Sequence, residues 1–130
     1  MTRRYLDGIF GAGAGEKHAR FLDGIENESL RETIHGYHAL ESDIAELSVA
    51  ENYLLGMTVL CALKSYGTAG MFAKTLAHLG VRREKILAAV ARLSMWTGGL
   101  QAVEASLQMQ RALDDHKARG LASLETWFPR

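Results

Sequence analysis

The sequence has few cysteines and prolines and no excess of charge of either sign. Cys61 has no second cysteine to pair with, which excludes an internal disulfide and favours a reducing cytosol. The one proline lies next to the C-terminus, so it interrupts no earlier helix. Fifteen basic residues balance fifteen acidic ones, which excludes the broad electrostatic attraction that brings nucleic acid or an anionic membrane to a protein.

Long apolar runs are absent as well. No stretch approaches the roughly 20 apolar residues that span a bilayer, because Lys64, Lys74 and Arg92 interrupt the apolar segments. Two arginines stand near the start, but Asp7 and several glycines break any apolar run behind them. We therefore expect no export signal, no membrane association and a cytoplasmic protein.

What the sequence does contain is apolar residues at helical spacing. Valine, isoleucine and threonine do not cluster in alternating runs, so a β-sheet is not expected. Almost half of the 130 residues are apolar, which fits one domain over residues 1–130 with a flexible N-terminal segment (1–15) and a C-terminal tail (119–130). The fold class expected is all-α, a helical bundle, with helices near residues 16–25, 29–40, 52–64, 66–79, 82–96 and 100–113.

Local motifs predict where some of these helices begin and end. "SLRE" has the form of a capping box, in which Ser29 and Glu32 satisfy backbone N–H groups, and "SVAE" at residues 48–51 repeats it. The run behind the second motif is apolar on nearly every face, so that helix is expected to be central and buried. Gly80 suits the left-handed position that follows a helix end.

The second half of the chain resembles a known family. "HLGVRREKILAAVARLSMWTGGLQAVEASL" is similar to the stretch of the carboxymuconolactone decarboxylase family in which Gly-Val-Thr-x-Glu-Glu-Ile leads through a helix to Tyr-x-Gly-x-Pro and a run of alanines. "LSVAENYLLGMTVLCALKSYG" resembles the family's preceding helix, so the likeness covers roughly residues 30–110. The matching places are Gly80, Val81, Glu84, Ile86, Trp96, Gly98 and Ala102. The resemblance implies an alkylhydroperoxidase-like bundle and a homo-oligomer, a trimer or hexamer.

The family's reactive residues are replaced here. Its alkylhydroperoxidase-like members use a Cys-x-x-Cys pair, a histidine and a glutamate; the matching positions are Ser65 and Thr68, Phe72, and Tyr53. Disulfide redox chemistry needs two sulfurs, so the sequence predicts that the chain is not a thiol peroxidase. The decarboxylase members also have a histidine at the position of Phe72.

The function expected is therefore a cofactor-independent, non-redox enzyme that performs acid–base chemistry. Decarboxylation, isomerisation or ring rearrangement of a hydrophobic or cyclic organic acid, or of an enolisable ketone, fits that description. The alternative is a catalytically silent module of the same fold that binds a small molecule or supports assembly. No cofactor is expected in either case.

Candidate catalytic residues gather in "ETIHGYHALESD". His35 and His38 are three residues apart, hence neighbours on a helix surface, and imidazoles transfer protons near neutral pH. Tyr37 lies between them as a candidate substrate contact. Two alternatives stay open: histidines that only pack and form hydrogen bonds, or a metal site with a nearby glutamate, although two histidines are too few ligands for zinc.

Other candidate site residues belong to the helices that follow. Tyr53 is a candidate catalytic group that hydrogen-bonds a carboxylate or enolate, and Glu51 shares the same helix start; otherwise Tyr53 is a core residue. Ser65 and Thr68 are either helix caps or residues lining a pocket. Phe72 and Trp96 are candidate walls of an apolar pocket, or core residues together with Met57, Met71 and Met95.

Overall fold

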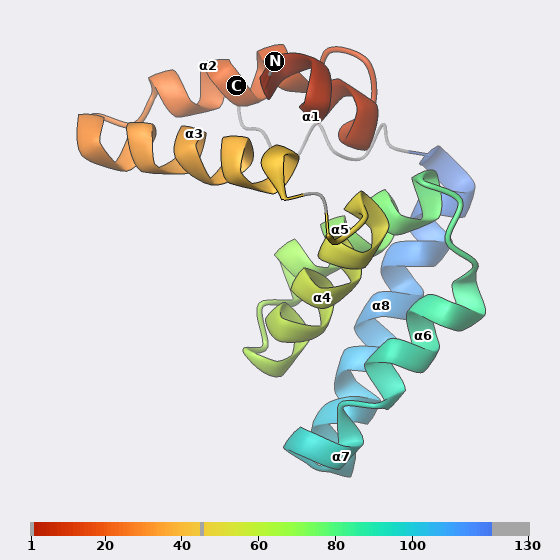
Figure 1. Ribbon diagram of the computed structural model, residues 1–130. Coiled ribbons are helices and arrows are strands. Elements are labelled where there is room, and N and C mark those ends of the chain that lie inside the picture. Colours follow the sequence, from red (N-terminus) through yellow and green to blue (C-terminus); the bar gives the residue numbers. More distant parts are fainter. Residues whose placement is uncertain (1, 45, 121–130) are drawn as a thin grey trace. The chain divides into compact units, whose positions relative to one another are not determined.

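The computed structural model describes residues 2–44 and 46–120, apart from the side chains of residues 2, 3, 5, 38, 39, 41 and 42 (Figure 1). The fold class predicted from the sequence is confirmed: the described residues form α-helices and no strand. They belong to two compact units, the first ending at Ser48 and the second beginning at Val49. A single domain over residues 1–130 stays a prediction, and the aromatic tail with Trp127 and Phe128 lies outside the described residues.

The first unit contains three helices, α1 (Thr2–Phe10), α2 (Ala14–Asp23) and α3 (Glu28–Asp43). Helix α1 packs against α2 and α3 and buries Leu6, Ile9 and Phe10. The glycine-rich opening predicts a connector, and the structure has a helix there instead. Its three apolar side chains lie on one face, and their burial outweighs the low helix propensity of the glycine among them.

The start of α3 differs from the predicted capping box. Asn27 is the N-cap residue, and its side-chain oxygen accepts a hydrogen bond from the Leu30 backbone N–H at 2.9 Å. Ser29 lies inside the helix, so the predicted capping role of Ser29 is wrong. Asparagine is among the best N-cap residues, and placing it there begins the helix two residues earlier.

The second unit contains α4 (Val49–Ala62), α5 (Tyr66–His78), α6 (Arg83–Ala91), α7 (Ser94–Thr97) and α8 (Gly99–Arg119). The four longer helices pack in a ring, α4 on α5, α5 on α8, α8 on α6, and α6 on α4. Small residues allow two of these contacts to be close: a Cβ at Gly56 would lie 2.8 Å from the Phe72 ring, and one at Gly70 would lie 3.2 Å from the Ala112 Cβ. No described helix is both long enough and apolar enough to cross a membrane.

Helices α4 and α5 end in the same kind of turn. After α5, Gly80 has φ +86°, and the N–H groups of Gly80 and Val81 donate to the carbonyls of Ala77 and Leu76, which confirms the predicted left-handed glycine. After α4, Lys64 takes the same place with φ +59°. A non-glycine residue in this conformation is strained, so the backbone at Lys64 raises the free energy of the folded chain.

Helix α4 is buried on one face only. Tyr53, Met57 and Cys61 recur every four residues and point into the core. Leu55 and Val59 on the same helix are exposed. The predicted burial on every face is therefore wrong, and α5, which packs against both α4 and α8, is the inner helix.

Candidate functional site

The histidine segment lies on α3 in the first unit. His35 and Tyr37 are both exposed, and the side chain of His38 is not among those described. Exposed side chains alone neither orient a substrate nor exclude solvent from it. Catalysis by His35 and His38 stays a prediction.

Tyr53 and Phe72 are brought together in the second unit. Tyr53 is only 2% exposed on α4, and its ring meets that of Phe72 on α5 edge to face, with 4.8 Å between centroids. Gly56, one turn after Tyr53 on α4, lies against the same ring, and a Cβ atom at residue 56 would come within 2.8 Å of it. An edge-to-face aromatic pair of this kind adds about 0.5–1.5 kcal/mol beyond area burial. Phe72 itself is half-buried.

Ser65 and Thr68 begin α5 as expected. Ser65 stands at the N-cap position, but its side chain makes no capping hydrogen bond, so the capping interpretation of Ser65 is wrong. Its φ of −84° and ψ of 63° lie outside the extended region from which a serine hydroxyl reaches the N–H groups of the first turn. Thr68 is half-buried inside the helix.

Glu51 and Trp96 lie at the surface of the second unit. Glu51 is an exposed residue in the first turn of α4, as predicted for that end of the helix. Trp96 on α7 is 82% exposed, and Met95 beside it is exposed too, so the assignment of both to the core is wrong. Met57 and Met71, assigned to the core by the same argument, are buried.

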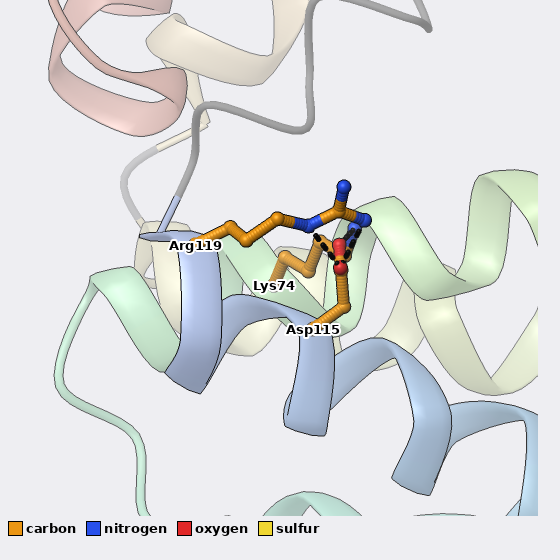
Figure 2. Close-up of polar contacts among 3 residues, drawn as sticks. All are labelled: Lys74, Asp115 and Arg119. Atoms are coloured by element: carbon orange, nitrogen blue, oxygen red, sulfur yellow. Dashed lines mark hydrogen bonds and ion pairs between the residues drawn. The ribbon is translucent and has the colours of Figure 1, made fainter.

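A group of charged side chains missed by the sequence reasoning joins α5 to the end of α8. Figure 2 shows Lys74 and Arg119 both reaching Asp115. The Lys74 Nζ atom donates to Asp115 Oδ2 at 2.5 Å, and the Arg119 Nε atom donates to Asp115 Oδ1 at 2.6 Å. Lys74 is 13% exposed and Asp115 is 22% exposed, so this contact is largely withdrawn from water. A spacing of 41 residues between lysine and aspartate leaves no local sequence pattern that could have revealed it.

His116 borders this group. Burial lowers the pKa of His116, the nearby His78 and Lys74 lower it further, and Asp115 opposes them in part. The imidazole is therefore held in its neutral form at pH values where an exposed histidine would begin to take up a proton.

A shallow hollow with a volume of about 410 Å³ lies where the end of α4 meets the start of α8. It is lined by Lys64, Thr97, Gly98, Gly99, Leu100, Gln101 and Glu104. The Gln101 amide at its edge donates to the carbonyl of Ala62 at 2.5 Å and so satisfies the end of α4. None of the predicted site residues whose side chains are described lines this hollow, and the hollow is open to solvent.

Neither a metal site nor a reactive thiol is found in the part of the chain that the structure describes. No three histidine, cysteine, aspartate or glutamate side chains converge there in a way that could hold a metal ion. Cys61 is fully buried on α4, and this burial raises the pKa of its thiol to about 11. At neutral pH the thiolate, which is the nucleophilic form, is almost absent.

Exposed apolar side chains are the most extensive feature of the second unit. One set lies along α4, and a second set lies on α7 and the first half of α8, where Leu100 is 90% exposed. The first set comprises Leu55, Val59 and Leu63, and the second comprises Met95, Trp96, Leu100, Val103 and Leu107. The sequence reasoning missed both sets because it assigned apolar residues at helical spacing to the core.

Comparison with known proteins gives no relative: no family model matches the chain, and no curated protein or solved structure matches it either.

Proposed function

We propose that this chain is a catalytically silent assembly module, built on an alkylhydroperoxidase-like helical bundle, that binds protein through the apolar faces of its second unit. The observation that carries the proposal is the pair of exposed apolar sets on α4 and on α7–α8. Large contiguous apolar surfaces on a folded unit are typical of sites that bind protein.

The packing around Phe72 supports the silent alternative over the acid–base enzyme. A pocket for a ring-containing substrate needs space next to the residues that would act on it. Tyr53 and Gly56, three residues apart on α4, both lie against the Phe72 ring. Tyr53 is buried in the core, and the half-buried Phe72 ring takes the position at which the resembling family has a histidine.

The experiment that tests this proposal is a thermal-shift screen with ring-containing carboxylic acids and enolisable ketones. A ligand that binds only the folded state raises Tm, and we expect no rise for the native chain. The positive control is Leu76→Ala, which removes a fully buried side chain on α5 and opens an apolar cavity; benzene should raise its Tm, as it does where an engineered cavity lined by apolar groups stays dry.

A specific result would overturn the assembly role. If one of the acids raises the Tm of the native chain, and His35→Gln removes both that rise and any turnover of the acid, then the chain is an acid–base enzyme. A cytoplasmic location, expected from the sequence with its single cysteine, stays a prediction.

A further inference from the structure

The second set of exposed apolar side chains, on α7 and the first half of α8, is regularly spaced along α8 rather than scattered. Leu100, Val103 and Leu107, which we call the α8 stripe, follow one another at intervals of three and four residues on one face of α8. This is the spacing by which one helix packs along another. Figure 1 shows α7, with Met95 and Trp96, at the N-terminal end of the same helix.

The size of this surface fits the apolar core of one half of a dimer contact. Its five apolar side chains are 52–90% exposed and present on the order of 300–400 Å² of apolar surface, since fully burying one large apolar side chain removes roughly 60–120 Å² from water. A stable interface buries about 800 Å² on each partner. More than half of such an interface is apolar and its rim is polar, and the exposed Glu104 and Arg111 lie on the same helix.

Charge does not keep two copies apart. The α8 stripe contains no ionisable residue, and the chain has a formal net charge of zero at pH 7. Copies without net charge experience no long-range repulsion, which favours association of like with like. The α8 stripe has no charge that would attract a strongly basic or acidic partner.

We infer that the α8 stripe pairs with the α8 stripe of a second copy of this chain, antiparallel about a two-fold axis near residues 101 and 102. This inference rests on the proposed function, because it names the partner of the same exposed surface. In this register Leu100 lies opposite Val103 of the second copy, and Leu107 lies at the end where that copy has Met95 and Trp96. Antiparallel helices also align their dipoles favourably, and closed two-fold dimers are the commonest assemblies.

The pairing is tested first by charge placed on each face. Sedimentation equilibrium of the native chain should give the mass of a dimer that dissociates on dilution. Val103→Glu should weaken the dimer at least about tenfold in Kd, since a carboxylate would be buried against Leu100. Leu55→Glu on α4 is the matched control, an exposed leucine in the same unit, and should leave Kd unchanged.

The register is tested by crosslinking with a short bis-maleimide. Residue 103 lies close to the axis, so Val103→Cys should crosslink to itself. With a rise of about 1.5 Å per residue along the helix, the two copies of residue 107 lie roughly 16 Å apart in the direction of the α8 helix axis. Leu107→Cys should therefore not crosslink. Native Cys61 is buried and should not react with the maleimide. The native chain treated in the same way is the control for crosslinking through Cys61.

Three results would overturn the inference: a monomer at every concentration, a dimer lost in Leu55→Glu but kept in Val103→Glu, or equal crosslinking at positions 103 and 107. Each leaves the proposed function standing as long as the ligand screen stays negative. The trimer or hexamer implied by the family resemblance is a separate prediction, because pairing through α8 accounts for one contact only.

Discussion

The ring of Phe72 lies so close to Gly56 that a Cβ atom at residue 56 would approach the Phe72 Cε2 atom to 2.8 Å. Helices α4 and α5 therefore meet at a point where one side is a bare backbone and the other is an aromatic ring. Glycine at this position lowers helix propensity, and the packing of Phe72 gives the reason for its presence.

Gly56→Ala should destabilise the second unit. Alanine improves helix propensity by about 1 kcal/mol, but overpacking against a ring costs about 1–3 kcal/mol, so a net loss is expected in the free energy of unfolding from urea titration. Gly67→Ala is the control, because a Cβ at residue 67 meets nothing within 4 Å. Equal effects of the two substitutions would show that Phe72 does not confine residue 56.

Lys64→Gly should stabilise the chain by up to about 1 kcal/mol, because glycine adopts the left-handed conformation at residue 64 without strain. The reverse change at the equivalent turn, Gly80→Lys, should be destabilising by a similar amount. Thermal unfolding of both variants checks the pair, and a loss of stability in Lys64→Gly would contradict the assignment of strain to that turn.

Asp115→Asn should lower the free energy of unfolding by about 1–3 kcal/mol, since it removes the carboxylate from the mostly buried Lys74. Lys74→Met combined with Asp115→Leu should recover much of that loss, because an apolar pair leaves no buried charge. Urea titration of the single and double variants gives the comparison. A double variant less stable than Asp115→Asn would mean that the charges themselves hold α5 to α8.

Stability should fall as the pH is lowered through the ordinary range of histidine titration. The pKa of His116 is lowered in the folded chain by burial, with His78 and Lys74 adding to the effect and Asp115 opposing it. The unfolded chain therefore binds a proton more readily, and the stabilisation by neutral His116 is lost from about pH 6.5 down to the folded pKa. Tm between pH 7.5 and 5.5 should drop less in His116→Gln than in the native chain, with His35→Gln on exposed α3 as the control; equal slopes in all three would remove His116 as the cause.

The parts of the fold that depend on residues close together in the sequence could be predicted from the sequence. Periodicity predicted the longer helices of the second unit, although residues 82–96 form two helices, α6 and α7, rather than the one predicted. Gly80 marked a helix end because few other residues adopt positive φ. Asn27 rather than Ser29 caps α3, and the sequence did not decide between them because both residue types suit that role. The helix at Thr2–Phe10 was missed because its glycine was given more weight than its buried face.

The candidate site was less accessible to sequence reasoning, because it depends on which faces of the helices meet. The sequence by itself determined that no disulfide can form within these 130 residues, since a bridge needs two sulfurs, and that the chain is helical, since its apolar period is helical. Only the tertiary structure decided that Phe72 meets Tyr53, that Lys74 meets Asp115, and that Trp96 and Leu100 face outward. Helical spacing places apolar residues on one side of a helix, but whether that side meets the core or a partner depends on contacts between distant segments.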